Sequence, residues 1–136
     1  QLVAVRGSQP LNPHEIKNVR IGVSSYAARQ NGNVAPPDTM GAQFSIPYCA
    51  ALALTAAPAD PAMFAPDAMD EPSRRELARR IDLVVDAQME AAYPKHYGAR
   101  VDLEERALQR PAVERGEMSP HSVADGLALR RTTLGR

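Results

Sequence analysis

Alternation of apolar and polar positions predicts three short strands. In the first, Val19, Ile21 and Val23 are separated by polar or small residues, which is the period of two that a half-buried strand shows. The same period recurs in IDLVVDA (81–87) and in GARVDLEE (98–105). These three runs are expected to form a sheet against which the rest of the chain packs.

A buried helix is predicted in AQFSIPYCAALAL (42–54), because this stretch is small and apolar almost throughout. Proline is tolerated in the first turn of a helix, where its missing N–H has no helical partner, and it disfavours helical geometry in the residue before it. The helix is therefore expected to begin at Pro47, with Ser45 or Ile46 as its cap, and to continue to about Ala57.

Proline, glycine and short periodic runs delimit the other segments. The sequence RQNGNVAPPDTMG (29–41) is expected to be a loop, and the prolines of residues 58–72 predict an irregular connector with a turn or two of helix. The remaining predicted elements are a short helix in SRRELARRI (73–81), a helical turn or loop at 88–97, a strand in LQRPAVER (108–115) and a last helix from Pro120 through Leu134.

This order of elements predicts an α+β fold, with a small antiparallel or mixed sheet and helices packed on one face. A length of 136 residues fits a single domain spanning residues 1–136. The chain begins with Gln1 and not with Met, as though an element were already under way. A fragment, a processed chain or one domain of a longer protein is therefore expected.

Composition narrows the classes of function. The chain has 16 basic and 16 acidic residues and a formal net charge of zero, which favours neither a nucleic acid nor a membrane as a partner. The single Cys49 excludes an internal disulfide and a metal site built from several cysteines, and it is compatible with a cytoplasmic location. No apolar run is long enough to span a membrane.

Most chemically capable side chains have a simple structural interpretation. His14, His96 and His121 are far apart and lack the spacing of metal ligands, so surface or capping roles are expected. Cys49 lies in the apolar helix, where a packed and inert thiol is expected. The glycines do not form a phosphate-binding pattern. Neither a metal site nor a phosphate-binding loop is therefore predicted.

Tyr48 is the exception. It falls in the first turn of the predicted helix, where free backbone N–H groups and the positive end of the helix dipole favour an anion. A tyrosine hydroxyl in such a place is able to hydrogen-bond a carboxylate or to pass a proton. The alternative interpretation is that Tyr48 only packs, with its hydroxyl at the edge of the domain. The residues alone leave both interpretations open.

Four stretches, in the same order along the chain, resemble the C-terminal domain of the MmgE/PrpD family, which includes 2-methylcitrate dehydratase and cis-aconitate decarboxylase. The most specific is DTMGAQFSIPYCAALAL (38–54), which is similar to the family's A-Q-F-S-[IL]-P-Y stretch and the Ala-rich helix after it. The others are LNPHEIKNVRIGV (11–23), ELARRIDLVVDAQMEAAYPKHYGARVDLE (76–104) and, more loosely, ERGEMSPHSVADGLALR (114–130). In one departure, this chain reads EERALQ where the family usually has an Asp-Gly hairpin turn after the third strand.

The resemblance implies an enzyme of two parts, in which a large helical domain carries most catalytic residues and a smaller α+β lid closes over the cleft. This chain resembles the lid alone, so it is expected to be inactive without the helical domain. The family's reactions abstract a proton beside a carboxylate of a small di- or tricarboxylate, followed by loss of water or carbon dioxide or by epimerisation. Its well-known members require neither a metal nor an organic cofactor.

Site residues and partners follow from the same resemblance. It implies a catalytic or substrate-binding role for Tyr48 and a weaker, substrate-binding role for Ser45. The expected partners are a small carboxylate substrate and the helical domain of the same enzyme, and a homodimer is left open. Two other hypotheses remain: a stand-alone or degenerate module that binds a carboxylate or a partner chain without turnover, and a purely structural α+β module.

Overall fold

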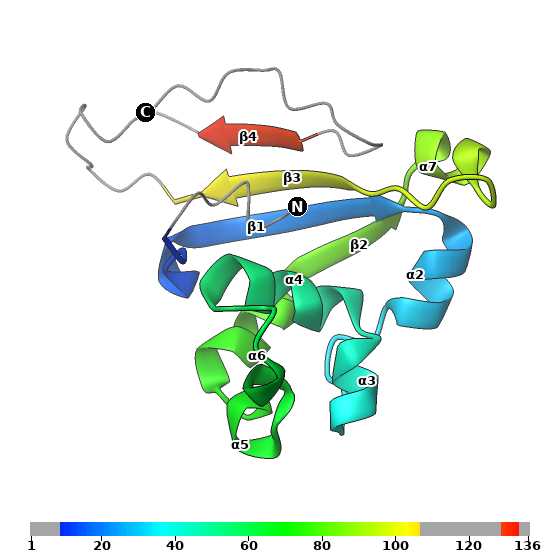
Figure 1. Ribbon diagram of the computed structural model, residues 1–136. Coiled ribbons are helices and arrows are strands. Elements are labelled where there is room, and N and C mark those ends of the chain that lie inside the picture. Colours follow the sequence, from blue (N-terminus) through cyan, green and yellow to red (C-terminus); the bar gives the residue numbers. More distant parts are fainter. Residues whose placement is uncertain (1–8, 107–128, 134–136) are drawn as a thin grey trace.

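The computed structural model describes residues 9–106 and 129–133, and for residues 129–133 it describes the backbone alone. Four strands form one sheet in the order β2-β1-β3-β4 (Figure 1). The three strands expected from alternation are confirmed as the first three of these. The bounds of the strands are Ile16–Val23 for β1, Ile81–Val85 for β2, Arg100–Glu105 for β3 and Leu129–Thr133 for β4.

The sheet is mixed. Strand β1 pairs in parallel with β2 and antiparallel with β3, and β3 pairs in parallel with β4. The register places Val19 opposite Ile81 in β2 and opposite Leu103 in β3. Because side chains alternate between the faces of a sheet, these apolar residues of three strands share one face.

Strand β4 shows that the predicted closing helix from Pro120 through Leu134 is wrong at residues 129–133. Their backbone pairs with β3, with Leu129 opposite Val101. The consecutive β-branched residues Thr132 and Thr133 favour a strand over a helix, and the period of the apolar positions did not reflect this. The strand predicted at 108–115 and the earlier part of the helix lie outside the described residues.

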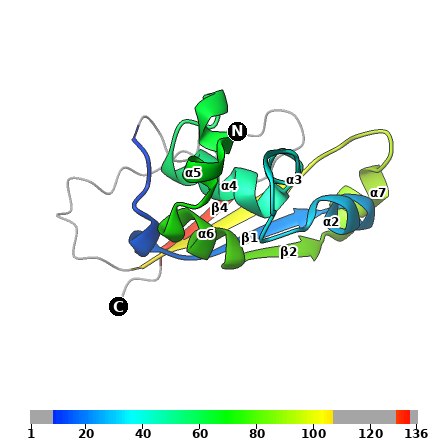
Figure 2. The same cartoon turned by 90° about the horizontal axis from the view of Figure 1, so that it is seen from below.

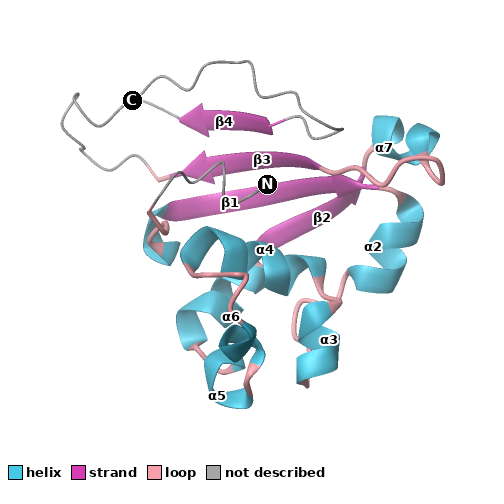
Figure 3. Ribbon diagram, viewed as in Figure 1, coloured by secondary structure: helices cyan, strands magenta, loops and turns pink. Residues whose placement is uncertain are grey.

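Short helical segments connect and cover the strands (Figure 3). Helices α2 and α7 lie at one end of the sheet, whereas α3, α4, α5 and α6 lie together on one side of it (Figures 1 and 2). The predicted short helix at 73–81 is confirmed as α6, and the predicted connector contains η2 and α5. The bounds are Pro13–Glu15 for η1, Ser25–Asn31 for α2, Thr39–Gln43 for α3, Ile46–Thr55 for α4, Pro61–Phe64 for η2, Pro66–Met69 for α5, Pro72–Arg79 for α6 and Ala87–Ala92 for α7.

The start of α4 agrees with the expectation from its proline. The helix begins at Ile46, one residue before the predicted start, and Pro47 occupies its first turn. Ser45 is the N-cap, because its backbone is extended and its side chain accepts a hydrogen bond from the amide of Tyr48. The helix ends at Thr55, two residues earlier than expected.

The loop predicted at 29–41 is wrong at both of its ends, where the structure has helix. Helix α2 extends to Asn31 and α3 begins at Thr39. Each helix has a side-chain cap: Ser24 accepts from the amide of Ala27, and Asp38 accepts from the amide of Gly41. Such caps stabilise helices of one or two turns that hydrophobic periodicity cannot reveal.

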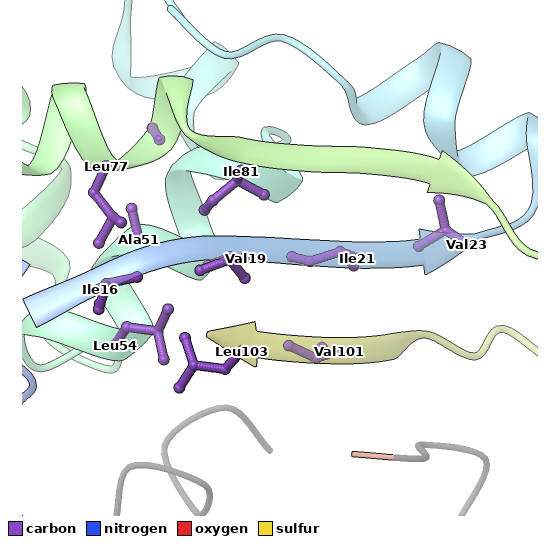
Figure 4. Packing of buried hydrophobic residues seen from close by; sticks show 12 residues of the cluster. Ile16, Val19, Ile21, Val23, Ala51, Leu54, Leu77, Ile81, Val101 and Leu103 are labelled. Atoms are coloured by element: carbon purple, nitrogen blue, oxygen red, sulfur yellow. The ribbon is translucent and has the colours of Figure 1, made fainter. Parts of the chain in front are cut away.

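The main core lies between the sheet and helices α4 and α6, which confirms helices on one face. Figure 4 shows Ala51 and Leu54 of α4 and Leu77 of α6 lying against side chains of the strands. Burying this apolar surface is the dominant stabilising contribution to the fold. The buried members of the main core are Ile16, Val19, Ile21, Val23, Ala50, Ala51, Leu54, Leu77, Ala78, Ile81, Val101 and Leu103.

A second cluster packs against a different face of α4. Tyr48 and Leu52, four residues apart on that helix, meet Ala42 of α3 and Met69 of α5. Phe64 of η2 borders this second cluster. The helix α4 therefore joins the main core to the second cluster.

Candidate functional site

Tyr48 lies in the second cluster and is almost completely buried. The residue is 2% exposed and lies in the first turn of α4, as expected. Its hydroxyl donates a hydrogen bond to the carbonyl oxygen of Met63 over 2.8 Å. Its ring centroid lies 5.9 Å from that of Phe64. The side chain thus ties α4 to η2, and its hydroxyl proton is held by a protein carbonyl.

Ser45 lies beside Tyr48 and is also buried, at 1% exposure. Its hydroxyl accepts a hydrogen bond from the amide of Tyr48 over 3.0 Å and donates one to the carbonyl oxygen of Asn33 over 2.5 Å. A serine hydroxyl has one proton, and here that proton is engaged within the domain. Ser45 therefore fixes both the start of α4 and the loop that precedes α3.

The first turn of α4 offers fewer free N–H groups than the sequence predicts. The amide of Tyr48 is capped by Ser45, and Pro47 carries no N–H. The amide of Cys49 donates to the carbonyl oxygen of Ser45, as the helix requires. Attraction for an anion near Tyr48 therefore has to come from side chains as well as from the helix dipole.

A small pocket beside Tyr48 supplies such side chains. Its walls come from the loop between α2 and α3, from α4 and from the segment that runs from α5 through α6. The space is about large enough for one water molecule. The residues that line the pocket are Val34, Ala35, Pro36, Tyr48, Met69, Arg75 and Arg79.

Two arginines of α6 bring positive charge to the pocket, and an ion pair with Asp70 offsets the charge of one of them. Arg75 donates from Nε to the carbonyl oxygen of Met69 over 2.9 Å and from Nη2 to the carboxylate of Asp70 over 2.7 Å. The side chain of Arg79 is exposed and forms no hydrogen bond or ion pair with any residue that the structure describes. The pocket is thus suited to an anionic group.

Sequence reasoning missed Arg75 and Arg79 as site residues. The available signal was their spacing of four residues within SRRELARR, which places them on one face of a helix. That signal does not reveal that the same face meets Tyr48 and the loop at Val34, because this meeting depends on how α6 packs against α4.

The other candidate side chains have structural surroundings. Burial raises the pKa of the Cys49 thiol, which keeps it in its less reactive protonated form, and its sulfur donates to the carbonyl oxygen of Ala42 over 3.3 Å. His14 lies in η1 and His96 follows α7, and both are exposed. His121 lies outside the described residues.

Residues 9–106 and 129–133 contain neither a candidate metal site nor a candidate membrane-spanning helix. Within these ranges, no three His, Cys, Asp or Glu side chains lie together in a way that could hold a metal ion. No helix in the same ranges is long and apolar enough to cross a membrane.

Comparison with known proteins bears on the family. No curated protein and no solved structure matches this chain significantly. The family model for the MmgE/PrpD C-terminal domain matches residues 1–119, which is most of the 136 residues. The match includes β1, α4, the pocket residues and β3. The chain therefore belongs to the MmgE/PrpD family and corresponds to its C-terminal domain.

Proposed function

We propose that this domain is the lid of a lyase or isomerase that acts on small di- or tricarboxylates, with 2-methylcitrate dehydration as the model reaction. The observation that carries the proposal is the pocket in which Tyr48 meets two arginines, within a domain of this family. A C-terminal domain of the family implies an N-terminal partner domain. The domain, spanning residues 1–136, would be inactive without that helical partner and would work in the cytoplasm.

In this proposal the two domains divide the chemistry. The helical domain supplies the base that removes a proton beside a substrate carboxylate. Tyr48 donates its hydroxyl proton to the substrate, either as a hydrogen bond or as a general acid, and Ser45 is the neighbouring substrate-binding residue. Because a carboxylate accepts hydrogen bonds and cannot donate them, the Tyr48 hydroxyl must exchange the carbonyl oxygen of Met63 for the substrate when the lid closes.

Replacement of Tyr48 by phenylalanine tests this role. In an enzyme assembled from this domain and its helical partner, Tyr48→Phe removes the hydroxyl and keeps the ring. We expect kcat for 2-methylcitrate to fall by roughly a hundred- to ten-thousand-fold if the hydroxyl acts as acid or base. The measurement is steady-state turnover at saturating substrate, combined with thermal unfolding to verify that the variant is folded.

Tyr97→Phe is the matched control, because Tyr97 is exposed and lies outside the second cluster. It should leave kcat unchanged. If Tyr48→Phe has the same kcat as the wild type, Tyr48 only packs and takes no part in catalysis. Turnover at an enzyme-like rate by the 136-residue chain alone would contradict the proposal that it is only a lid.

One observation favours a second candidate function, a binding or structural module without catalysis. The hydroxyls of Tyr48 and Ser45 both donate to backbone carbonyl oxygens within the domain, as they would in a purely structural cluster. The two candidates differ in the assembled enzyme. A module without catalysis predicts no turnover of any small carboxylate, whatever residue stands at position 48.

A further inference from the structure

We infer that Arg75 and Arg79 of α6 form the subsite that binds one carboxylate group of the ligand, with Arg79 as the main donor. This inference rests on the proposed function, which it deepens by naming the residues that recognise the substrate. Both side chains line the pocket that also contains Tyr48. They come from a different element than Tyr48 does, so the ligand would connect α4 to α6.

The other arginines of this helix and its end show what is unusual about Arg79. Arg74 is buried and donates to the carbonyl oxygen of Ala68 over 2.6 Å. Arg80 donates to the carbonyl oxygen of Ile16 over 2.5 Å. Both therefore hold the protein's own backbone. Among the described residues, the Arg79 side chain has no such partner.

The pair has hydrogen-bond donors that suit a carboxylate. Arg75 is held in place by Met69 and Asp70, and a guanidinium carries five N–H donors, so donors remain on Arg75 after these two bonds. Arg79 lies one helical turn further on. Arginine binds carboxylates through two parallel hydrogen bonds, so two arginines that line one small pocket offer donors to a carboxylate that lies against it.

Like charges four residues apart destabilise a helix, which makes the Arg75 and Arg79 pair costly unless something offsets it. The C-terminal dipole of α6 offsets part of this cost, since Arg79 is the last residue of the helix. This purely structural role and the ligand-binding role predict different results. If the charge of Arg79 serves only to offset the dipole of α6, removing it should change the unfolding free energy and leave ligand binding unchanged.

The test is calorimetric titration of the 136-residue chain with citrate, at constant ionic strength. Arg79→Gln should weaken citrate binding by roughly tenfold or more, as expected for loss of hydrogen bonds to a charged group. Arg79→Lys keeps the positive charge but loses the planar guanidinium, so its affinity for citrate should fall between those of the wild type and Arg79→Gln. Inorganic phosphate should bind more weakly than citrate to the wild-type chain.

Lys95→Gln is the matched control, because it removes one positive charge from an exposed residue between α7 and β3, and it should bind citrate as the wild type does. Equal citrate affinity of wild type and Arg79→Gln, absence of citrate binding by the wild type, or phosphate binding as tight as that of citrate would each overturn the inference. Binding needs no turnover. Suppose that Arg79→Gln loses citrate binding and that the assembled enzyme with the wild-type domain is inactive. This combination would support the subsite and refute the proposed function.

Discussion

The main core and the second cluster share the helix α4 but differ in what surrounds them. The main core contains only aliphatic side chains and is closed on one side by strands that are hydrogen-bonded to each other. The second cluster contains a tyrosine and a methionine, and it is closed by α3, η2 and α5, each of only four or five residues. Helices this short depend on packing for their stability.

This difference separates the part that holds the fold from the part that we propose binds a ligand. In the main core, each side chain has one role, which is to remove apolar surface from water. In the second cluster, Tyr48 also holds a carbonyl through its hydroxyl, and it borders a pocket with two arginines. A rearrangement on ligand binding would therefore take place in the second cluster, with the main core as its rigid support.

The sharpest test of this difference uses two leucines of α4, both with 0% exposure. Leu54 packs in the main core and Leu52 in the second cluster. Leucine-to-alanine changes in protein cores cost about 2–5 kcal/mol of unfolding free energy, and the cost is higher where the site cannot collapse into the cavity. We expect Leu54→Ala in the upper half of this range and Leu52→Ala in the lower half.

Urea unfolding of both variants and of the wild type measures the two costs. Equal costs would mean that the second cluster is as rigid as the main core, and the proposed division would fail. A control for these variants should remove apolar side-chain atoms only. Ala57→Gly is unsuitable for this purpose, because it also changes the backbone entropy of the unfolded chain. Val85→Ala is a better one, since Val85 is an exposed apolar residue at the end of β2, and it should cost much less than either leucine change.

Helix α6 borders both regions, so weakening its start tests how firmly the pocket is tied to the main core. The carboxylate of Glu71 caps α6 by accepting from the amides of Ser73 and Arg74 over 3.2 and 2.8 Å. Replacing a capping side chain by alanine costs about 0.5–2 kcal/mol of unfolding free energy. Because Glu71 is partly exposed, we expect Glu71→Ala in the lower half of that range.

The same cap predicts a dependence on pH. The hydrogen bond from the Ser73 hydroxyl, and after it those from the Arg74 and Ser73 amides, lower the pKa of the Glu71 carboxyl in the folded state. Its contribution to stability is therefore fully present above the ordinary glutamate pKa of about 4.3 and is lost as the pH falls through the lowered value. Unfolding free energies of wild type and Glu71→Ala should converge on acidification, and a constant difference would contradict this.

Much of the main core was predictable from the sequence. Apolar and polar residues alternate with a period of two in its strands, and a proline marks the first turn of its principal helix. Val19, Ile21 and Val23 alternate as expected, and each is buried. The segments that were missed are short. Helix α3 depends on the Asp38 cap, and β4 forms by pairing with β3, a long-range contact that no local pattern records.

The site was less predictable than the fold. The residues alone singled out Tyr48, and the family resemblance added Ser45. The roles proposed for both remain predictions, but neither the pairing of the Tyr48 hydroxyl with Met63 nor the pocket beside it was foreseen. Both depend on where the connector at residues 58–72 folds back onto α4. The position of Arg75 and Arg79 at the pocket depends likewise on the packing of α6, which their spacing of four residues does not reveal.

The smallest expected effect concerns the shapes of the two regions. Met69, 3% exposed in the second cluster, is a flexible side chain suited to irregular gaps, whereas Leu103 of β3 lies opposite Val19 of β1 and is buried in the main core. Leucine and methionine have similar volumes, and exchanging them usually costs less than about 1.5 kcal/mol. We expect Met69→Leu to cost little in unfolding free energy and Leu103→Met to cost more, because the main core has one well-defined shape to fill. The reverse order, measured by urea unfolding of both variants, would show that the second cluster is the more tightly specified region, and Tyr48 would then have little freedom to leave Met63 for a ligand.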